Sequence, residues 1–286
     1  MARNNPIIKV VQQYSLGFLS GKGGSGKSLT AFMTSTALKS EGYSVCLIDT
    51  DAQRSINFFA SDEIRINNIN SMIATLQKNI ATWLRLNNNG AHSKRISEAK
   101  EKIEALEDSK KLAVEYLDLT NPDISKIVDE LESIKNKHSD KDFLIFDFKG
   151  ELTSVQSALV TSLDLVLVPF RPKALEVQGV LPIIQLAANT PKTEFTSILI
   201  TSSKSNLSEV SKALLPQIFE AVPMPDFCIS ESVVYENAIE RGLGVSEILV
   251  KNELTNSFYN NKAKFDYLKN EVSQLALFVI NKAASN

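Results

Sequence analysis

The sequence predicts an α/β protein built on a mostly parallel, twisted sheet flanked by helices. Short apolar runs bounded by polar or turn residues alternate with longer segments of helical period, which is the pattern of parallel strands joined by crossover helices. The runs are apolar almost throughout, as strands covered on both faces must be. Hydrophobic residues make up 43% and charged residues 22% of the 286 residues, so the chain can bury a large core. We expect a single domain over 1–286.

The elements of this fold are expected in alternation along the chain. The predicted strands are Leu16–Ser20, Val45–Asp49, Phe143–Asp147, Leu165–Pro169, Ser197–Thr201 and Phe227–Ser230. The predicted helices are Lys27–Lys39, Leu175–Ala188, Ser208–Glu220, Val233–Arg241 and, within a C-terminal helical segment over 251–286, Ala263–Asn281.

Residues 62–140 interrupt the alternation, because they offer several helical patterns and no convincing strand. We expect a helical insertion there. One face of a predicted helix in this segment carries an apolar stripe. Residues 92–118, which contain the stripe, include six basic and seven acidic residues. Packing of the stripe on its own protein is favoured over a partner-binding helix. The stripe consists of Ile96, Ala99, Ile103, Leu106, Ala113 and Leu117.

Charge and cysteine content exclude several classes of protein. With 31 basic and 33 acidic residues the net charge is −2, so the chain is not an overall polycation. Cys46 and Cys228 lie far apart in apolar settings, which gives neither a disulfide framework nor a CxxC pair. The N-terminus lacks a signal-peptide pattern, and no apolar run reaches 18 residues. We therefore expect a cytoplasmic protein without a membrane partner.

A glycine-rich segment carries the strongest chemical signal. Four of the eleven glycines fall within Gly21–Ser28, whose sequence is GKGGSGKS, between a predicted strand and a predicted helix. The segment matches two phosphate-binding patterns, GxxxxGK[ST] of nucleoside triphosphate sites and GxGxxG of dinucleotide sites. The dinucleotide pattern would use Asp49 as its acidic residue, but it has no use for Lys27 and Ser28. A triphosphate needs both, a lysine for the β- and γ-phosphates and a hydroxyl for Mg²⁺, so this interpretation is favoured.

A second lysine, Lys22, follows the first glycine and gives KGGxGK[ST]. With it the sequence resembles the deviant Walker A P-loop ATPases, the group containing ParA, MinD, ArsA and the nitrogenase iron protein. The resemblance implies a P-loop NTPase fold, ATP and Mg²⁺ as cofactors, and a nucleotide-sandwich homodimer in which Lys22 reaches the partner's phosphates. A fixed cation there would stabilise charge developing between the β- and γ-phosphates.

Carboxylates at the ends of two predicted strands complete the expected site. Asp49-Thr50-Asp51-Ala52-Gln53 resembles the family's DxDxQ motif, which implies that Asp51 positions or activates the attacking water and that Asp49 supports Mg²⁺. Asp51 could also serve as a helix N-cap. The run ending at Asp147 has the Walker B form that assists Mg²⁺, and Ser28 would be the third metal-binding residue. Where the family continues Asp-x-Pro-Pro, this chain has Phe148-Lys149-Gly150.

Later segments resemble the family's base-binding region. Pro169-Phe170-Arg171-Pro172 is similar to the VPxxP turn, and Thr201 stands near the place of an adenine-reading asparagine. Tyr235 to Ser246 resembles a YxxA…G.SV segment. The resemblance covers roughly 15–61 and 141–250. Lys22, Lys27 and Asp51 are the expected catalytic residues; the expected nucleotide-binding residues are Gly21, Lys22, Gly23, Gly24, Ser25, Gly26, Lys27, Ser28, Leu29, Pro169, Arg171, Pro172 and Thr201.

The cysteine pattern argues against the iron–sulfur members of the family, and the last helix is too poor in basic residues for a membrane-binding one. The resemblance then favours a ParA-type partition ATPase that binds DNA without sequence preference, associates with the nucleoid and works with a ParB-like or other small adaptor. The alternatives are a MinD-like positioning ATPase and a metabolic ligase of the dethiobiotin- or cobyrinate-synthase type. Candidate DNA contacts are Arg241, Lys251, Lys262, Lys264, Lys269 and Lys282.

Overall fold

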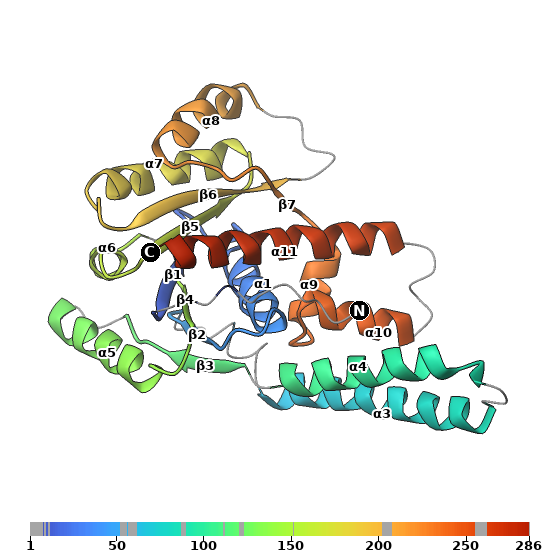
Figure 1. The fold of residues 1–286 in the computed structure, drawn as a ribbon. Helices are drawn as coiled ribbons and strands as arrows, with labels where there is room; N and C mark the ends of the chain where they lie inside the picture. Colours follow the sequence, from blue (N-terminus) through green and yellow to red (C-terminus); the bar gives the residue numbers. More distant parts are fainter. Residues whose placement is uncertain are drawn as a thin grey trace.

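In the computed structural model, one sheet of seven strands forms the centre of the protein (Figure 1), and every strand pairing in it is parallel. The structure describes residues 8, 10, 12–51, 56, 62–86, 90–110, 112–119, 123–150, 152–201, 208–254 and 262–285. The strand order is β3-β2-β4-β1-β5-β6-β7. The strands are β1 (Tyr14–Phe18), β2 (Val45–Asp49), β3 (Ala113–Tyr116), β4 (Phe143–Asp147), β5 (Leu165–Phe170), β6 (Glu194–Thr201) and β7 (Ile229–Ser230).

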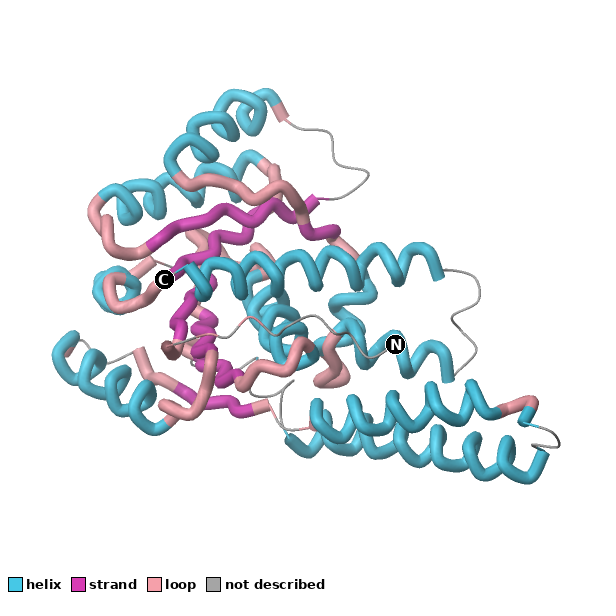
Figure 2. The backbone as a smooth tube through the Cα atoms, in the orientation of Figure 1, coloured by secondary structure: helices cyan, strands magenta, loops and turns pink. Residues whose placement is uncertain are grey.

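Helices cover both faces of the sheet (Figure 2), and each face has its own apolar core. Side chains alternate between the faces, so Leu16 and Leu47 enter one core while Cys46 and Ile48 enter the other. The first face carries α1 (Lys27–Ser40), α3 (Asp62–Leu86), α4 (Ser93–Ser109), α9 (Val233–Ile239), α10 (Val245–Leu254) and α11 (Lys262–Ser285); the second carries α5 (Ile124–Lys137), α6 (Ser154–Val160), α7 (Ala174–Ala188) and α8 (Glu209–Ala221).

The predicted fold class is confirmed, with small shifts at the element ends. Strands β2 and β4 have the predicted bounds, because each is an apolar run closed by an aspartate. Strand β1 lies two residues earlier than predicted, at Tyr14–Phe18. The hydroxyl of Ser20 donates to the carbonyl of Lys22, so the chain already turns into the glycine loop there.

The segment 62–140 is not wholly helical, which corrects the prediction. Helix α4 ends at Ser109, and Ala113–Tyr116 forms the edge strand β3, paired with β2. Ala113 and Leu117 therefore do not continue the helical stripe. The helical part of the stripe does pack on the protein as expected, since Ile96, Ala99 and Leu106 are buried.

Helices α3 and α4 form an antiparallel hairpin that projects beyond the body of the molecule (Figures 1 and 2). A buried ion pair holds its base: Arg65 of α3 contacts both carboxylate oxygens of Glu247 in α10, at 2.5 and 3.0 Å. The Arg65 guanidinium also donates to the carbonyls of Ser109 and Gly242. Arg65 thus joins the start of α3 to the end of α4 and attaches both helices to α10.

The last helix, α11, packs along α1 with an apolar stripe facing the core. Leu268, Val272, Leu275 and Val279 are buried, and Phe265 packs against the same core. Among the helices that the structure describes, none has the length and apolar character needed to cross a membrane.

Candidate nucleotide site

The glycine loop follows β1 and leads into α1, as the sequence predicts, and its backbone leaves little room for side chains. A Cβ atom on Gly21 would lie 1.7 Å from the carbonyl oxygen of Gly179 in α7, so only glycine fits there. Gly26 is the N-cap of α1 in the left-handed conformation, with φ of 86°, and no side chain caps the helix. The first amides of α1 are therefore available to an anion, which helix N-termini favour.

Polar side chains lie buried at this turn. Lys27 is the first residue of α1 and its side chain is only 6% exposed. Burial lowers the pKa of Lys27, while the nearby charges of Asp147 and Asp51 oppose the shift. The buried hydroxyl of Ser25 has no hydrogen-bond partner among the described residues. A buried cation and an unpaired hydroxyl beside free amides suit the oxygens of a polyphosphate.

Two carboxylates lie at the carboxyl ends of neighbouring strands. Asp49 and Asp147 are register partners at the last positions of β2 and β4, and Asp147 is also the partner of Phe18 in β1. Burial raises the pKa of Asp147 to about 7. The charges of Asp49 and Asp51 add to this rise, whereas a hydrogen bond from Ser28 and the charge of Lys27 oppose it. One oxygen of Asp147 is buried without a hydrogen-bond partner in the described part of the chain.

These residues fit a magnesium ion that is shared with a phosphate ligand. The predicted metal-binding residues, Ser28, Asp49 and Asp147, offer hydroxyl and carboxylate oxygens, which Mg²⁺ prefers. The described residues contain no group of three His, Cys, Asp or Glu side chains that could enclose a metal by themselves. Mg²⁺ commonly keeps water and substrate phosphates among its ligands, so two carboxylates and a hydroxyl suffice. The ion would supply positive charge to the phosphates.

The two remaining predicted catalytic residues border this centre. The amide of Asp51 donates to Asp49 at 2.9 Å, which places Asp51 directly after the β2 end, half-buried. Ala52 and Gln53 of the DxDxQ motif lie outside the described residues. Lys22, in the same glycine loop, is exposed. The structure therefore distinguishes the two lysines, because Lys27 is buried and Lys22 is exposed to solvent.

The departure at Phe148-Lys149-Gly150 brings the segment after β4 against the glycine loop. A Cβ atom on Gly150 would lie 2.9 Å from both the Cα and the nitrogen of Gly23. Phe148 is buried in the core of the second sheet face, where its ring stacks on Phe146 at 6.1 Å between centroids. Gly150, which stands where the family pattern has its second proline, therefore packs against the phosphate loop.

A cavity beside the start of α1 lies where the sequence predicts base binding. It is lined by Gly26, Leu29 and Arg171, together with residues of β6, β7, α9 and α11. Arg171 donates to the carbonyl of Gly24, and its guanidinium also lies 2.8 Å from Glu231. Arg171 therefore ties the end of β5 to the glycine loop and to the segment after β7.

The other predicted base-binding residues have backbone roles around this cavity. Pro169 lies within β5, and the Pro172 carbonyl accepts a 2.8 Å hydrogen bond from Ser211 of α8. Thr201 ends β6, and its carbonyl accepts the amide of Glu231 at 2.6 Å. None of the three lines the cavity. Glu231 does line it, although no sequence pattern singles this residue out, because it follows a strand of only two residues.

The comparisons with known proteins agree with this geometry. A family model described as an AAA domain matches residues 15–200. The chain belongs to this family. Its KGGSGKS loop and its parallel sheet have the deviant Walker A form of the P-loop fold that ParA and MinD proteins share.

Among similar proteins, Protein ParA of Rhizobium radiobacter is 28% identical over 157 residues, 55% of this AAA-family chain and 48% of the relative. The chain thus spans about half the length of that relative. Solved structures with a similar fold include Cyanothece McdA in complex with ATP (16% identity, TM-score 0.55, covering 94% of this chain and 97% of that one). MinD of Pyrococcus horikoshii with Mg-ADP is another (16% identity, TM-score 0.52, covering 95% and 94%).

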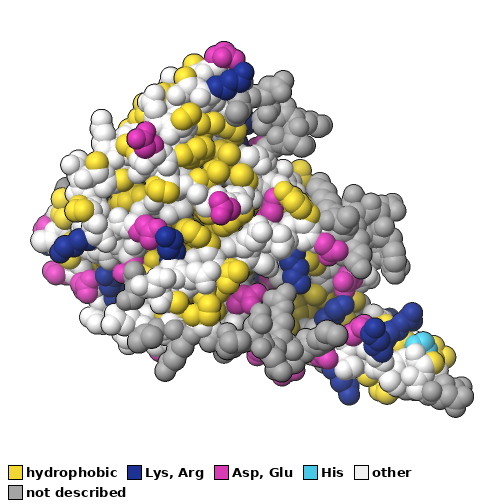
Figure 3. Space-filling view, turned by 45° about the horizontal axis from the view of Figure 1, so that its top comes forward, with side chains coloured by type: hydrophobic (Ala, Val, Ile, Leu, Met, Phe, Trp, Pro, Cys, Tyr) yellow, Lys and Arg dark blue, Asp and Glu magenta, His cyan; other side chains and the backbone are white. Residues whose placement is uncertain are grey.

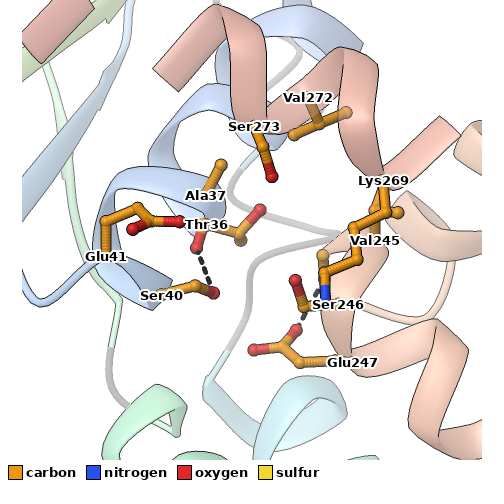
Figure 4. A pocket seen from close by; sticks show the side chains of 11 residues that line it. Thr36, Ala37, Ser40, Glu41, Val245, Ser246, Glu247, Lys269, Val272 and Ser273 are labelled. Carbon is orange, nitrogen blue, oxygen red and sulfur yellow. Dashed lines mark hydrogen bonds between the residues drawn. The ribbon is translucent and has the colours of Figure 1, made fainter. Parts of the chain in front are cut away.

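The segment from Tyr235 onward joins the last strand to the last helix of the AAA-family fold. The Tyr235 hydroxyl donates to Glu271 of α11 at 2.8 Å, and Glu271 also accepts the amide and the hydroxyl of Ser230. At the far end of α1 a separate cavity lies between α1, α10 and α11 (Figure 4). Glu247 there accepts the amide of Gly244, so a carboxylate already caps the start of α10.

Proposed function

We propose that this protein is a Mg²⁺-dependent ATPase that hydrolyses ATP to ADP and phosphate and uses the cycle as a switch. The observation that carries the proposal is the meeting of Lys27, Ser28, Asp49 and Asp147 beneath one glycine loop. The buried lysine would hold the phosphates, and the hydroxyl and carboxylates would hold Mg²⁺. Asp51, next along the chain, would position the attacking water.

The exposed Lys22 supports a homodimer formed with ATP. Lys22 is exposed on the glycine loop, so its side chain is free to extend toward the phosphates of a facing copy. Its charge would then stabilise the transition state only when two subunits meet, which couples hydrolysis to dimerisation. Lys22, Lys27 and Asp51 are the catalytic residues in this proposal.

The cellular role that we propose for this ATPase cycle is the partition or positioning of a cargo. The match to a ParA protein and the ParA/MinD type support it. In this proposal the ATP-bound dimer binds DNA without sequence preference and associates with the nucleoid in the cytoplasm. A ParB-like or other small adaptor stimulates hydrolysis and releases the dimer, so that a gradient of bound protein moves the cargo.

Binding of unrelated DNA duplexes, measured by biolayer interferometry with ATP, with ADP and without nucleotide, tests this function. We expect binding with ATP and Mg²⁺ only, similar for all duplexes and falling steeply with salt. ATP turnover without any added small substrate is expected in parallel. Equal binding with ADP, or turnover that requires a carboxylate substrate, would contradict the proposal and favour a metabolic ligase.

A further inference from the structure

The far half of the α3–α4 hairpin carries a concentration of positive charge. Residues 78–86 and 90–100, which we name the basic tip, contain five Lys or Arg and one acidic residue, Glu98. In the space-filling view, basic side chains gather on the projecting arm (Figure 3). The five basic residues are Lys78, Arg85, Lys94, Arg95 and Lys100.

This charge is exposed and weakly neutralised. All five side chains are exposed, and within the described part of the chain only Lys94 has an ion-pair partner, Glu98 at a distance of 3.9 Å. The near half of α4 is acidic instead, with Glu101, Glu104, Glu107 and Asp108. The near-balance of charge over 92–118 therefore conceals a separation of charge along the hairpin, which a merely solvated helix face does not need.

The hairpin is held rigidly enough to present its tip. Its base is fixed by the buried pair of Arg65 and Glu247, and Lys102 of α4 pairs with Glu253 of α10 at 2.5 Å. With a rise of about 1.5 Å per residue, α3 carries the chain about 30 Å from Arg65 to Leu86. The basic tip thus stands clear of the acidic body, whose repulsion would otherwise oppose binding of a polyanion.

The surface chemistry favours DNA phosphates over a membrane. The apolar face of α3 is already used, since Ile69, Met72, Ile73 and Leu76 are buried in the core. Among the described large apolar side chains of the hairpin, only Leu84 and Leu86 are exposed, each at 59%, and could enter lipid. Two leucines offer less apolar surface than a single fatty acyl chain, which by itself gives only marginal membrane binding.

The candidate DNA contacts of the C-terminal region are less suited to this role. Lys282 is paired with Glu194, and Lys251 donates to Asn68 at 3.1 Å. Lys269 lines the cavity between α1, α10 and α11, and the side chains of Lys262 and Lys264 lie outside the described ones. Of the six, Arg241 and Lys269 are described as exposed, and neither has a described side-chain partner. They lie singly, one after α9 and the other in α11, and do not form a cluster of basic residues.

We propose that the basic tip, residues 78–86 and 90–100, binds the phosphate backbone of duplex DNA. This inference rests on the proposed DNA-dependent function and assigns the surface that performs it. In a dimer two tips act together, and their linkage raises the affinity of the second contact through effective concentration. Phosphate contacts by lysine and arginine carry no sequence information, so binding is independent of sequence.

A triple variant, Lys78→Gln, Arg85→Gln and Arg95→Gln, tests the tip against a matched control. The control, Lys126→Gln, Lys192→Gln and Lys212→Gln, removes the same charge from exposed positions on the other side of the sheet. Each lost phosphate contact should reduce the slope of log affinity against log salt by about 0.9. We expect the tip variant to lose about 2 to 3 units of slope per hairpin and at least about tenfold in affinity with ATP, at an unchanged thermal midpoint.

The outcomes separate this inference from the proposed function. If the wild-type protein binds DNA with ATP and the tip variant binds as tightly as the control variant, the tip inference is wrong and the proposed function stands. If the wild-type protein does not bind DNA, both fall. Vesicles containing phosphatidylglycerol are the third arm: wild-type binding to them that is lost in the tip variant, with DNA binding retained, would assign the tip to a membrane instead.

Discussion

Asp49 and Asp147 face each other across the parallel register of β2 and β4, each as the last residue of its strand. Both are buried, with exposed fractions of 0% and 2%. Two adjacent carboxylates in a buried place favour either a proton or a metal ion between them, because like charges cannot both be accommodated without a cation. The stability of the protein should therefore depend on whether this pair of carboxylates holds a proton or a metal ion.

The first prediction is a pH dependence of stability in buffer without divalent cations. The pKa of Asp147 is raised to about 7 in the folded protein, so the folded state holds a proton that the unfolded state has lost. The proton on Asp147 therefore stabilises the folded state. This stabilisation is fully present below about pH 4 and is lost as pH rises through 7, at no more than about 1.4 kcal/mol of unfolding free energy per pH unit. Urea denaturation at pH 5 to 8 should show the decline in the wild-type protein and not in Asp147→Asn. Identical pH profiles would contradict the assignment.

The two loop lysines should have separable roles. Lys27→Ala removes the buried cation beneath the loop and should abolish ATP binding in calorimetry. Lys22→Ala removes an exposed side chain and should retain ATP affinity, while the nucleotide-dependent dimer and hydrolysis are lost. Equal loss of ATP binding in both variants would count against a role of Lys22 across the dimer.

Gly150 should be needed for the shape of the phosphate loop. A Cβ atom at this position would press on the backbone of Gly23 at 2.9 Å, so Gly150→Ala must displace one of the two segments. We expect a loss of ATP affinity of about tenfold or more, which corresponds to about 1.4 kcal/mol. The neighbouring Lys149→Ala is the control, because Lys149 is exposed, and it should bind ATP normally. Normal affinity in both variants would show that the loop tolerates the added atom.

The buried pair of Arg65 and Glu247 should dominate the attachment of the hairpin. Arg65→Met leaves the Glu247 carboxylate buried without its cation, which should cost about 3–5 kcal/mol of unfolding free energy. Replacing both residues by Met should recover part of that loss. The half-exposed pair of Lys102 and Glu253 is the control, since Lys102→Met should cost less than about 1 kcal/mol. A small effect of Arg65→Met in denaturation experiments would contradict this account.

The sequence predicted the elements that have a strong local signal. Strands β2 and β4 are apolar runs closed by Asp49 and Asp147, so their bounds could be read directly. Strand β3 could not, because Ala113–Tyr116 is a four-residue edge strand with only half-buried side chains. Its pairing with β2 comes from the sheet edge that β2 offers and not from its own pattern.

Contacts between segments that are distant along the chain could not be predicted from the sequence. Arg65 and Glu247 are 182 positions apart, and nothing local marks either as one half of a buried pair. Gly150 is similar, since its role depends on the glycine loop more than a hundred residues earlier. The residues of that loop, by contrast, were all placed correctly at the turn between β1 and α1 because the motif itself encodes the local geometry.

The most direct test of the account is the mass of the Asp51→Ala variant in sedimentation velocity with ATP and Mg²⁺. If Asp51 positions the attacking water, hydrolysis should fall by about 10²-fold or more while ATP affinity is nearly unchanged. The variant should then sediment as a long-lived dimer with ATP and as a monomer with ADP. A monomer with saturating ATP, or wild-type turnover in this variant, would contradict the ATP-dependent switch.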